Sequence, residues 1–157
     1  MTDVALRELE DSDLDAIFDQ MRDPESVRMA AFTAKDPADR AAFDAHMKRI
    51  RALPDVRFLA VTRDGELVGT IGSYVMDGET DITYWVDRAC WGQGIAGQAV
   101  ALFLELVTER PLHARAASDN LGSLAVLRRA GFRDTGTEIA YANARGAEIE
   151  ETLLRLE

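Results

Sequence analysis

The sequence contains little cysteine and little histidine, and these shortages exclude two classes of protein. Its 157 residues include one cysteine, Cys90, so no disulfide bond can form within the chain and a reducing, cytoplasmic location is expected. The two histidines, His46 and His113, are distant from Cys90 and from each other in the sequence. Because soft metal ligands are so few and so scattered, we predict no metal site.

Long apolar runs are also lacking. The longest, Ala99 to Leu104, stops at Glu105 and is too short to cross a membrane. Residues 1–10 are acidic and have no apolar core, so no secretion signal is expected. These two observations predict a protein without a membrane partner.

Basic residues are outnumbered, with 18 Lys and Arg against 28 Asp and Glu, which gives a formal net charge of -10. This balance argues against a nucleic-acid partner and suits a cationic partner such as an amine. Solubility alone would explain the same charge equally well. The net charge therefore limits the class of partner but does not identify the partner.

The remaining composition and the periodicity are those of one globular α/β domain over residues 1–157. A mixed, mostly antiparallel sheet of six to seven strands is predicted, with about four helices on its two faces. The expected strands are 4–9, 57–61, 66–75, 80–86, 112–117, 133–142 and 148–156. The expected helices are 13–22, one that Asp36 caps and that ends before Pro54, 95–106 and 121–130, with a short helical piece over 25–30. Gly131 and Phe132 predict a Schellman ending for the helix over 121–130.

The stretch Trp91 to Ala99 organises the chain and reads Trp-Gly-Gln-Gly-Ile-Ala-Gly-Gln-Ala. Gly92, Gly94 and Ala96 remove bulk from a turn that follows the strand over 80–86 and precedes a helix. Free amides at a helix start, together with the helix dipole, bind phosphate or pyrophosphate. The alternative is a plain tight loop, in which the glycines serve the turn alone.

Read literally, Gly92-x-Gly94-x-x-Gly97 also matches the dinucleotide-binding fingerprint, with Asp119 where an acidic ribose ligand is expected. In that fingerprint the first glycine follows the strand almost directly, whereas Asp87 to Trp91 intervene here. Too few residues follow Asp119 for the remaining strand and helix units. A P-loop is disfavoured because no Gly-Lys-Ser or Gly-Lys-Thr follows the turn.

Four motifs together resemble the GNAT superfamily of acetyl-CoA-dependent N-acetyltransferases. They are Tyr84-Trp85-Val86, Trp91-Gly92-Gln93-Gly94-Ile95-Ala96, Asn120 to Ser123, and Gly131-Phe132. With Leu6-Arg7-Glu8-Leu9 and Asp13-Leu14, they are similar to the RimJ/RimL-like branch, which acetylates protein N-termini. The departure is Trp91, where much of the superfamily carries Gln or Arg; Trp is common in this branch.

The resemblance implies acetyl-CoA as co-substrate, with no metal, and a binding site built mainly from backbone. The amides that would hold the pyrophosphate belong to Gln93, Gly94, Ile95, Ala96 and Gly97, in a turn flanked by Trp91 and kept open by Gly92. The strand edge at Trp85 and Val86 would pair with the pantetheine arm. The Val86 amide would face the thioester oxygen and stabilise the oxyanion. Asn120 would hydrogen-bond the pantetheine or, alternatively, only cap the following helix.

The chemistry that the resemblance implies needs a proton acceptor and a proton donor. A free α-amine has a pKa of about 8, so a base must remove a proton before the amine attacks the thioester. Asp81 and Glu138 are the candidate bases, with Glu79 a further one. The carboxylates at 148, 150 and 151 are predicted to form a solvated face.

Ser123 is the candidate that returns a proton to the CoA sulfur. Many superfamily members use a tyrosine seven residues after the asparagine, but that position is Leu127 here. A serine in the first turn of a helix also serves as a cap, so the two roles stay open.

The predicted function is transfer of acetyl to a primary amine by direct attack, without a covalent enzyme intermediate. The acceptor would be a protein N-terminus or a small amine, and the resemblance suggests a homodimer. The alternative is a catalytically silent acyl-CoA-binding or scaffold protein, because Leu127 replaces the usual tyrosine. Turnover that falls on Ser123→Ala substitution would separate the enzyme from the binding protein.

Overall fold

A computed structural model describes residues 3–157 and contains a mixed sheet of seven strands in the order β1-β2-β3-β4-β5-β7-β6. All neighbouring strands are antiparallel except β4 and β5, which are parallel. The strands are β1 (Val4–Glu8), β2 (Arg57–Arg63), β3 (Glu66–Met76), β4 (Glu79–Val86), β5 (Leu112–Ala117), β6 (Arg133–Ala142) and β7 (Ala147–Leu156). The predicted fold class is confirmed.

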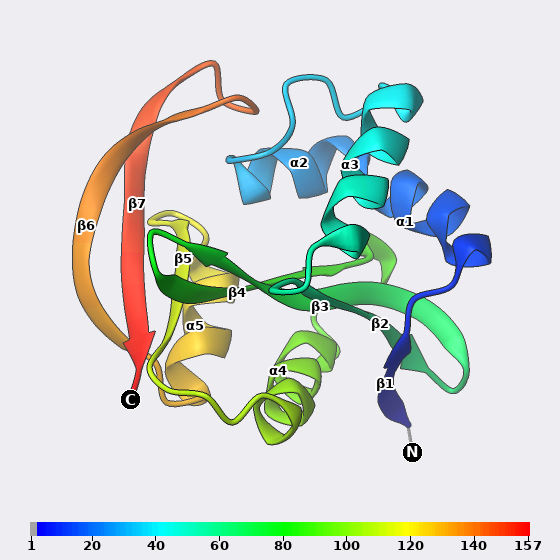
Figure 1. The fold of residues 1–157 in the computed structure, drawn as a ribbon. Coiled ribbons are helices and arrows are strands. Elements are labelled where there is room, and N and C mark those ends of the chain that lie inside the picture. Colours follow the sequence, from blue (N-terminus) through cyan, green and yellow to red (C-terminus); the bar gives the residue numbers. More distant parts are fainter. Residues whose placement is uncertain (1–2) are drawn as a thin grey trace.

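Five α-helices cover the two faces of this sheet. They are α1 (Leu14–Met21), α2 (Pro24–Ala30), α3 (Arg40–Ala52), α4 (Ile95–Leu106) and α5 (Leu121–Arg129), with short 3-10 helices η1 (Asp11–Asp13) and η2 (Arg88–Cys90). Helices α1 to α3 lie on one side of the sheet and α4 and α5 lie on the other (Figure 1). The helices on both faces fit the long central strands, which are apolar along much of their length.

The main core lies between the sheet and helices α4 and α5. Phe103 of α4 and Leu127 of α5 are fully buried there against Val61, Ile71 and Leu154 of the sheet. Burial of each such side chain contributes about 1.5–3 kcal/mol relative to its exposure to water. The two helices therefore hold their N-terminal ends, and whatever these ends bind, in a fixed place.

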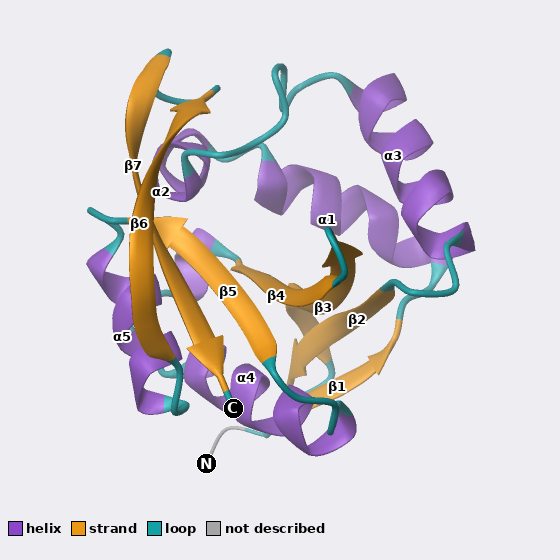
Figure 2. Ribbon diagram, turned by 60° about the vertical axis from the view of Figure 1, so that its left-hand side comes forward, coloured by secondary structure: helices purple, strands orange, loops and turns teal. Residues whose placement is uncertain are grey.

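Strands β4 and β5 meet at one registered pair only, Asp81 with His113. Beyond this pair the β1–β4 part of the sheet and the β5–β7 part splay apart (Figure 2). The end of β4, from Thr83 to Val86, therefore runs along an open gap on its β5 side. This gap lies at the carboxyl end of the first strand of a βαβ unit, where ligands of α/β sheets usually bind.

One predicted helix boundary differs from the observed one, and one predicted helix ending is confirmed. The helix expected from Asp36 begins at Arg40, because Asp39 is the residue whose side chain accepts a hydrogen bond from the Ala42 amide, at 3.0 Å. Asp36 instead accepts from the Ala38 amide and forms a turn before the helix. The Schellman ending at Gly131 is confirmed: the Phe132 amide donates to the Leu127 carbonyl at 3.0 Å.

No helix within residues 3–157 has the length and apolar character needed to span a membrane.

Candidate active site

The turn before α4 presents free backbone amides. Gly92 and Gly94 both have φ of +77°, a left-handed conformation that glycine adopts without strain. Gly94 caps α4 without a side chain, and the first hydrogen bond within the helix runs from the Gln98 amide to the Gly94 carbonyl. The amides of residues 95–97 therefore have no partner within the helix. This arrangement suits an anion such as pyrophosphate.

The surface of this turn is uncovered. A Cβ atom added at Gly92 or at Gly97 would meet nothing within 4 Å. Gln93 and Ala96 lie at the same surface, whereas Ile95 is 2% exposed and packs into the core. The turn thus combines a buried anchor with an open backbone.

Polar contacts fix the segment between β4 and the turn. The Asp87 side chain accepts a hydrogen bond from the Ala89 amide at 3.2 Å, and the indole of Trp91 donates to the Val86 carbonyl at 3.0 Å. The Arg63 guanidinium donates to the Gln93 side-chain oxygen. Because both ends of the turn are anchored, its amides are preorganised.

The open edge of β4 presents the amide of Val86. The Asp87 amide donates to the Val68 carbonyl of β3 at 2.8 Å, and Val86 is paired with Gly69. Because backbone groups alternate along an antiparallel ladder, the Val86 amide points away from β3, toward the gap beside β5. The predicted oxyanion donor is therefore oriented into the site.

Trp85 contributes its backbone to this edge, while its side chain is used elsewhere. Its indole donates to the Gln20 carbonyl of α1 at 3.2 Å. On β3, a Cβ atom at Gly69 would lie 2.1 Å from the Trp85 carbonyl oxygen, so only glycine permits this close approach of the two strands. Both contacts set the position of the strand edge.

A cavity of about 220 Å³ occupies the gap between β4 and β5. Residues from the centre of β4, from β5, and from the start of α5 form its walls, and Ala30 and Phe32 close it on the α2 side. Of the predicted site residues, Trp85, Asn120 and Ser123 line it, together with Tyr74, Ile82, Thr83, Tyr84, Ala114, Arg115, Ala116, Leu127 and Glu151. Asp81 and Glu138 are not among its lining residues.

Ser123 has a partner that the sequence did not reveal. The Tyr84 hydroxyl lies 2.6 Å from the Ser123 hydroxyl and also donates to the Ser123 carbonyl at 3.3 Å. Burial raises the pKa of Tyr84, although the hydrogen bond with Ser123 opposes this effect. Tyr84 therefore stays protonated at neutral pH. Leu127, at the position of the usual tyrosine, is buried in the core instead.

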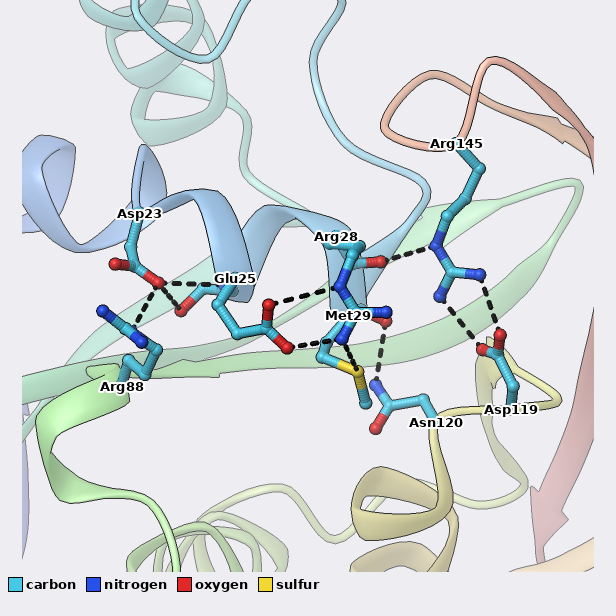
Figure 3. Close-up of polar contacts among 9 residues, drawn as sticks. Asp23, Glu25, Arg28, Met29, Arg88, Asp119, Asn120 and Arg145 are labelled. Atoms are coloured by element: carbon cyan, nitrogen blue, oxygen red, sulfur yellow. Dashed lines mark hydrogen bonds and ion pairs between the residues drawn. The ribbon is translucent and has the colours of Figure 1, made fainter.

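Asn120 uses both of its side-chain polar atoms within the protein. Its oxygen accepts from the Ser123 amide at 3.3 Å, which confirms the helix cap, and its nitrogen donates to the Met29 carbonyl of α2 at 3.3 Å (Figure 3). These contacts join α2 to the start of α5 beside the cavity. A contact with pantetheine stays a prediction.

The two candidate bases meet at one arginine. Arg115 of β5 donates from Nε to Asp81 Oδ2 at 3.1 Å and from Nη1 to Glu138 Oε1 at 3.1 Å. Asp81 is 1% exposed, and its second oxygen, Oδ1, has no hydrogen-bond partner among the described residues. The structure thus brings together residues from β4 and β6 that lie far apart in the sequence.

Glu151 belongs to the same cluster, which corrects the prediction of a solvated face. It is 5% exposed and lies 3.7 Å from Arg115, because β7 is flanked there by β5 and β6. Glu148 and Glu150 lie beyond the end of β5 and are exposed as expected. The alternation of a strand does not show which neighbours cover it, so Glu151 could not be found from the sequence.

The surroundings shift the pKa values of two groups in this cluster. Burial and the neighbouring Glu138 raise the pKa of Glu151 to about 7, against the opposing charge of Arg115. Burial and the nearby Asp81 carboxylate raise the pKa of Tyr74. The cavity therefore has a titratable carboxyl group close to neutral pH.

An ion pair at one end of α2 and a hydrogen bond at the other connect this helix to the walls of the site (Figure 3). Asp23, which caps α2, pairs with Arg88 of η2 at 3.0 Å, next to the glycine turn. At the other end of α2, Arg145 of the β6–β7 loop donates to the Arg28 carbonyl and makes two hydrogen bonds with Asp119, at 2.8 and 3.0 Å. Helix α2 thus links the turn, the start of α5 and the β6–β7 loop.

No three His, Cys, Asp or Glu side chains of the described chain are placed to hold a metal ion together.

Comparison with known proteins places the chain in a family. The profile described as "Acetyltransferase (GNAT) domain" matches residues 3–133. A curated relative, the uncharacterized N-acetyltransferase p20 of Bacillus licheniformis, is 24% identical over 163 residues, which cover 98% of this chain and 92% of that protein.

Two solved structures share the fold over almost the whole chain. Mycobacterium smegmatis RimJ, in complex with CoA-disulfide, has a TM-score of 0.82 and 26% identity, covering 98% of this chain and 81% of that one. Spermidine N-acetyltransferase from Vibrio cholerae, in complex with CoA and spermine, has a TM-score of 0.79 and 13% identity, covering 98% and 94%.

Proposed function

Because this chain belongs to the GNAT acetyltransferase family of acyltransferases, we propose that it transfers acetyl from acetyl-CoA to a primary amine by direct attack on the thioester. The observation that carries this proposal is the junction of the glycine turn, the open edge of β4 and the cavity behind it. The turn would take the pyrophosphate on the amides of residues 93–97, with Gly92 keeping it open. The cavity would then take the acceptor.

The strand edge supports a position for the thioester. In this proposal the pantetheine arm lies along Trp85 and Val86 as an added strand, in the gap beside β5. The Val86 amide, which points into that gap, donates to the thioester oxygen as negative charge develops on it. The Trp91 indole donates to the Val86 carbonyl and so fixes the peptide unit that follows this amide.

Ser123 is our proposed proton donor to the departing sulfur. Its hydroxyl lies in the cavity wall, and the Tyr84 hydroxyl at 2.6 Å can replace the proton that it gives up. A partly buried hydroxyl pair of this kind would relay a proton to the sulfur. Asn120 positions Ser123 through the cap and, as proposed, contacts the pantetheine.

We assign the role of base to the carboxylates at Arg115. Glu138 is the accessible one of the two predicted bases, since its side chain is 45% exposed. The Asp81 side chain is buried and is paired with Arg115, so it would act through that arginine. The cluster carries more negative than positive charge and would attract an ammonium group.

For the acceptor, we propose a protein N-terminus or a small aliphatic amine, within the RimJ/RimL-like branch. The motif resemblance to the RimJ/RimL-like branch supports the first, and the fold shared with a spermidine N-acetyltransferase supports the second. A cytoplasmic location and a homodimer complete the proposal as expectations from the cysteine content and the family.

Thermal unfolding with and without millimolar acetyl-CoA, with NADH as control, tests the co-substrate. A ligand present at about a hundred times its Kd adds roughly 2.7 kcal/mol and raises Tm by several degrees. We expect this rise with acetyl-CoA alone. The absence of a rise would contradict the proposal, and a rise without turnover on a broad panel of amines would favour the silent acyl-CoA-binding protein.

A further inference from the structure

Glu138 and Glu151 lie directly opposite each other in the β6–β7 register. Like charges in such cross-strand pairs are destabilising. Both carboxylates approach the same atom of Arg115, Nη1, at 3.1 and 3.7 Å. One guanidinium group is thus shared by this pair and by Asp81.

The two members of the pair differ in their surroundings. The Glu138 side chain is 45% exposed, whereas the Glu151 side chain is 6% exposed and lines the cavity beside Tyr84 and Ser123. Together they connect the cavity to solvent through two adjacent carboxyl groups. Asp81 does not line the cavity, so it has no such connection.

We propose that Glu138 and Glu151 form a proton-sharing carboxyl pair that takes the proton from the acceptor ammonium, with Arg115 as their positioning residue. The inference deepens the proposed function and rests on it. With the shared proton on Glu138, the Glu151 carboxylate is the acceptor: the N–H bond of the ammonium breaks, its electron pair stays on nitrogen, and the proton binds an oxygen of Glu151. Glu138 then passes a proton to solvent, which restores the singly protonated pair.

The groups around Glu151 keep this pair balanced. Burial, Glu138 on β6 and Asp81 on β4 disfavour ionisation of Glu151, and the positive charge of Arg115 on β5 opposes them. Tyr74 on β3 lines the same cavity. With one shared proton, the cluster of three carboxylates and one guanidinium has a net charge of -1. The site would therefore favour amines that are protonated at neutral pH, which identifies aliphatic primary amines as the acceptor class.

The kinetic test uses Glu151→Gln and Glu138→Gln, with Glu150→Gln as a matched control on the exposed side of β7. At pH 7 we expect kcat/KM of the first two variants to fall by about 100-fold, the usual scale of acid-base catalysis, and that of the control to stay unchanged. The loss should shrink toward pH 10, because a growing share of the amine is then already neutral. An equal loss at all pH values, or no loss, would overturn the pair.

A second readout needs no acetyl-CoA. The pKa of Glu151 in the folded state, about 7, lies above its ordinary value, so this group stabilises the fold below pH 4.5 and loses that contribution as pH rises to 7. The Tm of Glu151→Gln relative to wild type should thus increase between pH 5 and 8. Parallel curves for wild type and Glu151→Gln would overturn the proposal, and Glu150→Gln should run parallel.

The two levels of inference fail in different ways. Wild-type protein that neither binds acetyl-CoA nor acetylates any amine would overturn the proposed function and the carboxyl pair with it. Wild-type turnover that both glutamine variants retain would overturn the carboxyl pair alone.

Discussion

The glycine turn and the Arg115 cluster are the two halves of the proposed site, and they are built by opposite means. The turn occupies one continuous segment, and its recognition groups are backbone amides that a local run of small residues exposes. The Arg115 cluster uses side chains from β4, β5, β6 and β7, so every member depends on the sheet register. Backbone recognition in the turn suits a co-substrate that does not vary, and side-chain recognition in the Arg115 cluster suits an acceptor that varies.

This contrast predicts that removing a side chain lowers the stability of the protein more in the Arg115 cluster than in the glycine turn. Arg115→Ala leaves three carboxylates without their shared cation, and breaking such buried ion pairs costs about 3–5 kcal/mol. Chemical denaturation at pH 7 measures this loss. It should shrink as the pH falls, because the carboxylates become protonated, and a loss independent of pH would contradict the electrostatic explanation.

Ser123 lines the cavity that Arg115 and Glu151 also line, and its removal should affect the chemistry alone. Ser123→Ala should lower kcat by about 100-fold while the acetyl-CoA-dependent rise in Tm is retained. Tyr84→Phe, which loses the hydroxyl but keeps the ring, should give a smaller decrease. If Ser123→Ala leaves kcat unchanged, the serine is only a helix cap.

The turn should be sensitive where its backbone is left-handed. Gly94→Ala places a Cβ atom at a φ of +77°, which costs about 1–2 kcal/mol and should weaken acetyl-CoA binding. Calorimetric titration and unfolding measure the two effects. Gly136→Ala is the control, since a Cβ atom there meets nothing within 4 Å, and equal effects at both glycines would refute the role of the turn conformation.

The smallest effect is expected at the border of the site. The Arg145 and Asp119 ion pair has one half-exposed partner, so Asp119→Ala should cost about 0.2–1 kcal/mol of stability, reduced further by salt. Unfolding in low and high salt measures it. A loss as large as that of Arg115→Ala would show that the two halves of the site depend on the β6–β7 loop.

The same contrast explains what the sequence could predict. The order of strands and helices followed from local periodicity, and the turn at Gly92 and Gly94 followed from local residue type. The predicted start of α3 is three residues too early, because Asp36 and Asp39 are both suitable caps. Only the structure shows that Asp39 is the one that accepts a hydrogen bond from an amide of the first turn.

Residues that act across the sheet could not be found in this way. Glu151 looks like its exposed neighbours in the sequence, and its burial depends on β5 and β6 lying on either side of it. Tyr84 was part of a recognised motif, but its contact with Ser123 depends on where α5 packs. Asp81 and Glu138 were chosen as separate alternatives, and their common partner, Arg115, went unrecognised.

Because β4 and β5 share a single registered pair, the hydrogen-bond ladder between them is incomplete. Seven strands form one sheet, yet the end of β4 has no registered strand partner on its β5 side within residues 3–157. When the proposed pantetheine arm occupies that gap, the co-substrate pairs with β4 in the place of a further strand. Amide hydrogen exchange at Val86 should then report occupancy directly, fast in the free protein and slow in the complex.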